Sequence, residues 1–196
     1  MLGVLSAAFT SPITRLRSLF KTLRRGCLMA TQLRFVQVYA ANPIQVREMV
    51  TNEGYINARA TITGALSVES SCSVQADGTT DVEIIRTLPS EMPSLAVAIV
   101  GDTLTVTERQ SWKLATEDSC SCTFRVDFSA PLTFLGIATM TYDGAHTSVV
   151  TEGEFKASIP FFGGKVENLA YEQTRRYLAK EETFAAGWLK NHGTTD

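Results

Sequence analysis

Apolar and polar residues alternate through most of the chain after residue 30, and this period of two predicts β-strands. Turn signals such as Asp77-Gly78 and Asp143-Gly144 separate the alternating segments. The predicted strands cover residues 32–40, 65–75, 81–88, 102–114, 119–128, 133–142 and 146–159. Because no long helix lies between successive strands, we expect an antiparallel sheet rather than a parallel, doubly wound one.

Short helices are predicted at two places between the strands. Asn42 is a suitable N-cap and Pro43 suits the first helical position, so a helix begins there. A second helix follows at residues 52–60, before the second strand. A further short helix is predicted in the apolar, proline-containing segment 89–100.

A long amphipathic helix is predicted for residues 165–190, which contain no proline and are rich in Ala, Leu, Glu, Lys and Gln. Its apolar residues recur at spacings of three, four and seven, namely Val166, Leu169, Ala170, Tyr177, Phe184 and Trp188. We expect Glu167, Glu172 and Arg176 on the opposite side of this helix.

These elements predict an α+β fold in which a curved seven-stranded antiparallel sheet wraps around the long C-terminal helix, with two short helices after the first strand. One face of the sheet must be covered and the apolar stripe of the helix must be buried, so each covers the other. A length of 196 residues suits one domain. We place it at residues 30–192, with a tail at 193–196.

Residues 1–29 are predicted to be a basic N-terminal extension. Five basic residues and no acidic residue precede Met29. The amphipathic pattern of residues 12–28 leaves open contact with a membrane surface or a targeting role. The alternatives are a disordered appendage, or a start codon assigned too early with Met29 as the true start. No segment is long and apolar enough to span a bilayer.

Several short motifs point to one family. They are YINARA at residues 55–60, RTLP at 86–89, VTE at 106–108 with Trp112, IPFFGGKVE at 159–167 and WL at 188–189. Together they resemble DUF2505, an actinobacterial family of uncharacterised function within the START and Bet v 1-like (SRPBCC) superfamily. The resemblance covers about residues 31–192 and implies the helix-grip fold. It implies no particular reaction, because the superfamily includes lipid carriers, hormone receptors, aromatic cyclases and chaperone regulators.

Charged and polar residues interrupt the apolar faces of two neighbouring strands. The inner face of the strand at 102–114 carries Glu108 and Gln110, and the strand at 81–88 turns Arg86 to the same side. We infer that Arg86 and Glu108 meet inside the fold, since an unpaired charge in a low-dielectric interior is costly. The alternative is a buried ion pair, or two strand-end residues that reach water, contributing only to the fold.

The long helix and another strand add candidates. Gln173, Tyr177 and Glu181 lie on or beside the apolar stripe, and Tyr142 is placed to present a hydroxyl group from its strand. The predicted ligand-binding residues are therefore Arg86, Glu108, Gln110, Trp112, Phe124, Tyr142, Gln173 and Tyr177. The alternative for Gln173 and the tyrosines is a margin or core position with no ligand.

The leading hypothesis is a non-catalytic protein that binds a small hydrophobic or amphipathic ligand in a cavity between the sheet and the C-terminal helix. One alternative is a cyclase or hydrolase in which Glu108 is a general acid or base and Arg86 or Tyr142 stabilises negative charge. It ranks second because an adjacent arginine lowers the pKa that such a carboxyl group needs near neutrality. The other alternative is a protein-interaction module with an exposed apolar patch.

The remaining reactive residues favour no metal, cofactor or nucleophilic site. The two histidines, His146 and His192, fall in a turn and near the C-terminus. Cys120 and Cys122 share one face of a strand without a nearby histidine, so we expect buried free thiols and a cytoplasmic protein. The chain after Met29 contains 13 basic and 20 acidic residues. This acidic excess provides no positive surface for nucleic acid.

Overall fold

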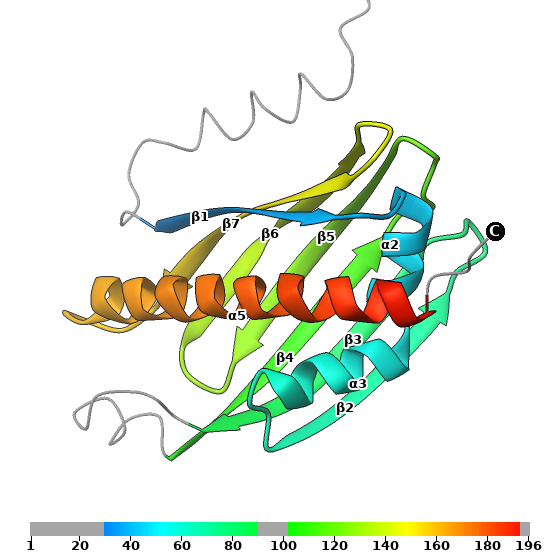
Figure 1. The fold of residues 1–196 in the computed structure, drawn as a ribbon. Helices are drawn as coiled ribbons and strands as arrows, with labels where there is room; N and C mark the ends of the chain where they lie inside the picture. Colours follow the sequence, from blue (N-terminus) through cyan, green and yellow to red (C-terminus); the bar gives the residue numbers. More distant parts are fainter. Residues whose placement is uncertain (1–29, 90–101, 193–196) are drawn as a thin grey trace, which may run out of the picture.

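The computed structural model describes residues 30–89 and 102–192 (Figure 1). The elements are β1 (Thr31–Tyr39), α2 (Pro43–Val50), α3 (Glu53–Ile62), β2 (Ser67–Val74), β3 (Thr80–Pro89), β4 (Thr103–Trp112), β5 (Ser119–Phe128), β6 (Leu132–Tyr142), β7 (Thr147–Ala157) and α5 (Gly163–His192). This order confirms the predicted strands, the two short helices after the first strand and the long C-terminal helix. The extension at 1–29, residues 90–100 of the further predicted helix and the tail at 193–196 lie outside the described residues.

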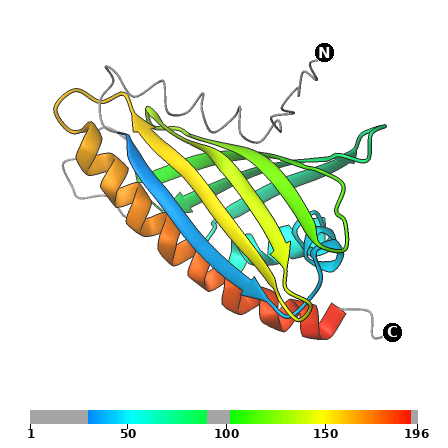
Figure 2. The same cartoon turned by 90° about the horizontal axis from the view of Figure 1, so that it is seen from above.

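In the described part of the chain, seven strands form one antiparallel sheet in the order β1-β7-β6-β5-β4-β3-β2. The strands from β2 to β7 pair with their neighbours in sequence, whereas β1 joins the far edge beside β7. The segment with α2 and α3 therefore connects the two opposite edges of the sheet. Figure 2 shows the sheet curving over α5, which confirms the α+β helix-grip fold.

Asparagine side chains start both short helices. Asn42 Oδ1 accepts a hydrogen bond from Gln45 N at 2.9 Å, and Gln45 Oε1 accepts one from Asn42 N at 3.1 Å, which confirms the predicted start of α2. Asn52 Oδ1 caps α3 by accepting a hydrogen bond from Tyr55 N at 3.0 Å. Tyr55 and Ile56 are fully buried, and their cluster packs α2 and α3 against one end of the sheet and of α5.

Helices cover both free edges of the sheet. At β1, Val38 N donates to the carboxylate of Glu182 on α5 at 2.7 Å. At β2, Cys72 N donates to the carboxylate of Glu53 on α3 at 3.1 Å. Because edge amides without partners attract other strands, these contacts protect both edges of the sheet from pairing with another chain.

The start of α5 corrects one prediction. Glu167, expected opposite the apolar stripe, is buried. Its carboxylate accepts hydrogen bonds from Thr31 N and Thr31 Oγ1, both at 3.1 Å, and from Ala157 N at 2.8 Å. These donors lie at the start of β1 and the end of β7. A carboxylate is therefore buried at this position because it accepts their hydrogen bonds. Glu172 is exposed, as expected.

Two facing glycines make room on the concave face of the sheet. Gly136 of β6 lies opposite Gly153 of β7. A Cβ atom at Gly136 would lie 2.1 Å from the carbonyl oxygen of Glu152 and 2.6 Å from Cζ of Phe124. A Cβ atom at Gly153 would lie 2.7 Å from the ring of Phe134. Glycine is therefore needed at both positions, because the phenylalanine rings occupy the space of a side chain.

Candidate functional site

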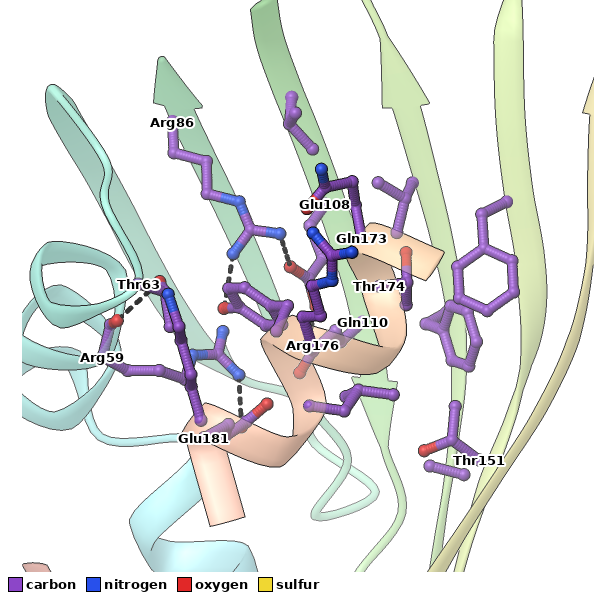
Figure 3. Close-up of a pocket in the computed structure, with 18 of the residues that line it drawn as sticks. Arg59, Thr63, Arg86, Glu108, Gln110, Thr151, Gln173, Thr174, Arg176 and Glu181 are labelled. Carbon is purple, nitrogen blue, oxygen red and sulfur yellow. Dashed lines mark hydrogen bonds and ion pairs between the residues drawn. The ribbon is translucent and has the colours of Figure 1, made fainter. Parts of the chain in front are cut away.

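A cavity of about 410 Å3 lies between the concave face of the sheet and α5. Its volume is within the range of roughly 300–1,000 Å3 typical of small-molecule sites. Gly64, Pro89, Arg176 and Lys180 are exposed members of its lining, so the cavity reaches solvent between the ends of α3 and β3 and the middle of α5. We call this place the mouth. Figure 3 shows a close-up of the cavity.

Strands β5 and β6 supply an apolar wall. Its members are Cys122, Phe124, Val126, Phe128, Leu132, Phe134, Ala138 and Met140. The Phe134 ring stacks on Phe155 with 4.1 Å between centroids, and the Phe124 ring lies 5.0 Å from Phe134. These two strands, both fully described, place no charged side chain in the lining.

The charged part of the lining comes from α3, β3, β4 and α5. Its members are Arg59, Arg86, Glu108, Arg176, Lys180 and Glu181. Figure 3 shows Arg59, Arg86 and Glu108 gathered around the middle of α5, which carries Glu181. The cavity is thus amphipathic, with its polar side next to the mouth and its apolar wall under β5 and β6.

Arg86 and Glu108 form the ion pair expected from the strand pattern. Arg86 Nη2 lies 3.3 Å from Glu108 Oε2, and the two side chains are 9% and 12% exposed. Gln110 Nε2 donates to Glu108 Oε1, and Trp112 Nε1 donates to Gln110 Oε1 at 2.6 Å. Alternate residues of β4 point inward, so Glu108, Gln110 and Trp112 form one row of polar contacts along the cavity.

Tyr177 joins α5 to this row. Its hydroxyl oxygen accepts a hydrogen bond from Arg86 Nη1. The guanidinium carbon of Arg59 lies 5.7 Å from the centre of its ring. Burial raises the pKa of Tyr177 and outweighs the opposite effect of Arg59 and Arg86. Tyr177 therefore keeps its proton at neutral pH.

A second buried ion pair, between Arg59 and Glu181, was not predicted. Arg59 Nη1 lies 2.7 Å from Glu181 Oε1, and Tyr55 Oη donates to the same oxygen at 3.5 Å. One signal in the sequence was available, because Tyr55, Ile56, Arg59 and Ala60 share one buried face of α3. An arginine on an apolar helix face needs a buried partner.

The Glu108 carboxyl group is ionised despite its burial. Burial alone would raise its pKa, but the charges of Arg86 and Arg59 and the hydrogen bond from Gln110 together lower it. Both carboxylate oxygens also have partners, since Oε1 accepts from Gln110 and Oε2 faces Arg86. The geometry therefore suits a fixed negative charge that orients its neighbours.

The remaining predicted residues are placed as follows. Trp112, Phe124 and Gln173 line the cavity together with Arg86, Glu108, Gln110 and Tyr177. Tyr142 does not line it. This tyrosine shares the inward parity of Met140, but it is the last residue of β6, beyond the end of the cavity. Arg176, expected opposite the apolar stripe, is exposed but lines the mouth.

Other reactive groups lie apart from one another. The described residues contain no group of three or more His, Cys, Asp or Glu side chains able to hold a metal ion. Cys122 is buried in the cavity wall, and this burial raises the pKa of its thiol. His146 is exposed in the turn before β7. None of the described helices is long and apolar enough to cross a membrane.

A long C-terminal helix held against a curved antiparallel sheet, with a cavity between them, defines a protein of the helix-grip class. The sequence matches, over residues 34–189, the model of a family described as "Protein of unknown function (DUF2505)", and the chain belongs to this family. This match confirms the family that the short motifs indicated. No curated protein matches the sequence.

Solved structures share the fold at low sequence identity. The protein TTHA0849 from Thermus thermophilus is 16% identical, with a TM-score of 0.51, over 78% of this chain and 95% of that one. Norcoclaurine synthase from Thalictrum flavum, solved with dopamine and hydroxybenzaldehyde, is 10% identical, with a TM-score of 0.51, over 99% of this chain and 100% of that one. The aromatase/cyclase Zhui from a Streptomyces species is 16% identical, with a TM-score of 0.47, over 81% and 90%. At these identities the likeness to the first two structures concerns the fold alone.

Proposed function

We propose that this protein binds a small amphipathic ligand in the cavity between the sheet and α5 and does not change it chemically. The observation that carries the proposal is the division of the lining into an apolar wall and a charged side. The apolar part of the ligand lies against Phe124 and Phe134, where burial contributes roughly 25 cal/mol per Å2. Arg86, Glu108 and Gln110 orient its polar part.

The state of Glu108 supports binding over catalysis. A carboxylate with a lowered pKa has no proton to donate as a general acid at neutral pH. Its strength as a base is reduced by the same contacts with Arg86 and Gln110. We therefore rank a cyclase or hydrolase reaction at Glu108 below binding. An interaction module without a cavity is also ranked lower, because a cavity of about 410 Å3 is present.

We also propose a cytoplasmic location. Cys120 and Cys122 are buried and free, and Cys72 is free as well. Free thiols in these positions are typical of proteins kept in a reducing compartment.

Tryptophan fluorescence tests the binding proposal. The chain has two tryptophans. Trp112 lines the cavity, whereas Trp188 packs on Tyr55 and Phe184 outside its lining. We expect ω-bromododecanol, an uncharged chain with a heavy-atom quencher, to quench Trp112 in the Trp188→Phe variant. In the Trp112→Phe variant, where Trp188 remains, we expect little quenching.

A cavity-filling variant provides the control. Ala138 lines the cavity and is buried, so Ala138→Leu takes up ligand space. Ala179 is exposed on α5 and does not line the cavity, so Ala179→Leu is the matched change. We expect the first substitution to weaken quenching of Trp112 and the second to leave it intact. Equal quenching of both tryptophans, or quenching unaffected by Ala138→Leu, would count against binding in this cavity.

A further inference from the structure

The polar side of the cavity has hydrogen-bond donors without acceptors. Arg59 Nε and Arg86 Nε are buried side-chain atoms that lack a hydrogen-bond partner among the described residues, and both are donors. The two side chains are 5% and 9% exposed, and both residues line the cavity. The Tyr177 hydroxyl oxygen accepts a hydrogen bond from Arg86. Its own proton is donated to no acceptor among the described residues. A buried donor without a partner is costly, so a ligand that brings acceptors fits this side.

The charges of the lining point the same way. Arg59 and Arg86 are each balanced by a carboxylate, through Glu181 and Glu108. Arg176 and Lys180 also line the cavity, one helical turn apart at the mouth, and neither forms an ion pair with a described residue. The lining therefore has a surplus of two positive charges, although the whole chain carries a net charge of −2. A local excess of one sign attracts a ligand of the opposite sign.

Resting on the binding function proposed above, we infer that the ligand is an amphipathic carboxylate whose head group lies beside Arg59 and Arg86. The carboxylate oxygens accept hydrogen bonds from the guanidinium groups of these two arginines and from the Tyr177 hydroxyl group. Arg176 and Lys180 attract the anion at the mouth, and its apolar part extends toward Phe124 and Phe134. A carboxylate suits this site because it offers several acceptor positions and no donor.

A matched pair of probes separates this inference from the binding proposal. ω-Bromododecanoate and ω-bromododecanol have the same chain and quencher but differ in the charge of the head group. In the Trp188→Phe variant at slightly alkaline pH, we expect the carboxylate to bind about tenfold more tightly than the alcohol, since charge-assisted hydrogen bonds are stronger than neutral ones. Equal affinities for the two probes would overturn the inference and leave the binding proposal standing. Absence of quenching by both would overturn the binding proposal itself.

Charge-neutral substitution of the buried pair tests the position of the head group. The Arg86→Gln/Glu108→Gln variant removes both charges together, which avoids leaving one of them unpaired in the interior. We expect the tenfold preference for the carboxylate to fall to less than about threefold, with little change for the alcohol. An unchanged preference in a folded variant would show that the head group lies elsewhere.

Two exposed double variants test the mouth. Arg176→Gln/Lys180→Gln is expected to weaken carboxylate binding about threefold to tenfold, with a larger effect at low salt. Lys156→Gln/Lys190→Gln removes the same charge from two exposed residues that do not line the cavity, and it should leave binding nearly unchanged. Equal losses in the two variants would mean that only the net charge of the protein matters.

Discussion

The Arg59 guanidinium and the Glu181 carboxylate are joined across 2.7 Å, which links α3 to α5 beside the cavity. Their side chains are 5% and 7% exposed, so each charge depends on the other. We expect Glu181→Gln to lower the free energy of unfolding by about 3–5 kcal/mol, because it leaves Arg59 buried without its counter-ion. Urea unfolding followed by circular dichroism measures this loss.

The double variant Arg59→Met/Glu181→Leu is the control for this pair. It replaces both charges with apolar side chains, so we expect it to be more stable than Glu181→Gln alone. The single variants Arg59→Met and Glu181→Leu complete the comparison. If the double variant lost as much free energy of unfolding as the two single variants together, the two residues would act independently.

The part of this site that follows from the sequence is the part that lies on strands, because side chains alternate regularly there. In a strand the period is two residues, so the alternation in β4 was enough to place Glu108 and Gln110 inside, and Arg86 followed from β3. The pair Arg59 and Glu181 is 122 residues apart in sequence. No local pattern specifies such a contact, because it depends on how α3 and α5 meet after folding.

Strand and helix ends explain the predictions that failed. Tyr142 has the inward parity of its strand, but parity does not say where along the strand the cavity ends. Glu167 lies at the start of α5. Its carboxylate contacts the backbone N–H groups of Thr31 and Ala157 there instead of apolar side chains. The sequence pattern assigns charged residues of a helix to its exposed side. It does not show that backbone N–H groups at the ends of two distant strands need the Glu167 carboxylate as an acceptor.

Glu108 is expected to make stability depend on pH in the acid range. Its pKa in the folded protein is lowered below the ordinary value of 4.5, so its contribution is present above that value and is lost as the pH falls through the folded pKa. At neutral pH, Glu108→Gln should lower the free energy of unfolding by about 3 kcal/mol by leaving Arg86 without its counter-ion. The difference between variant and wild type should shrink as the pH drops below 4.5. Urea unfolding at a series of pH values measures both.

An exposed pair on the same two strands is the comparison for Glu108. Glu83 and Arg109 lie 2.7 Å apart, but their side chains are 43% and 55% exposed. Glu83→Gln should therefore change stability by less than about 1 kcal/mol. If the loss from Glu108→Gln were equally small, or did not vary with pH, the buried ion pair would not be contributing as its geometry indicates.

Gly136 is expected to tolerate no side chain. A Cβ atom there would lie 2.1 Å from the Glu152 carbonyl oxygen, which is backbone and cannot move aside alone. We expect Gly136→Ala to lower the free energy of unfolding by about 2–3 kcal/mol and to displace the ring of Phe124 in the cavity wall. Thermal unfolding measures the first effect.

A glycine-to-alanine substitution within α5 should change the free energy of unfolding in the opposite direction. Gly187 lies in the helix, and a methyl group at this position would have no atom outside the local helix backbone within 4 Å. Gly187→Ala should raise the free energy of unfolding by up to about 1 kcal/mol, because glycine is the less favourable residue in a helix interior. Similar losses at both positions would contradict the steric explanation for Gly136.

Glu167 provides a test of the contact between α5 and the strand ends. Its carboxylate accepts hydrogen bonds from Thr31 N, Thr31 Oγ1 and Ala157 N. In Glu167→Gln, the side-chain NH2 group faces at least one of these donors, so at least one hydrogen bond is lost and a donor is left without an acceptor. We expect the free energy of unfolding to fall by about 1–3 kcal/mol. Glu172→Gln, an exposed change about one turn and a half further along α5, should cost less than about 0.5 kcal/mol. Hydrogen exchange at Ala157 N should quicken in the first variant and not in the second, and equal exchange rates in both would show that this amide does not depend on the Glu167 carboxylate.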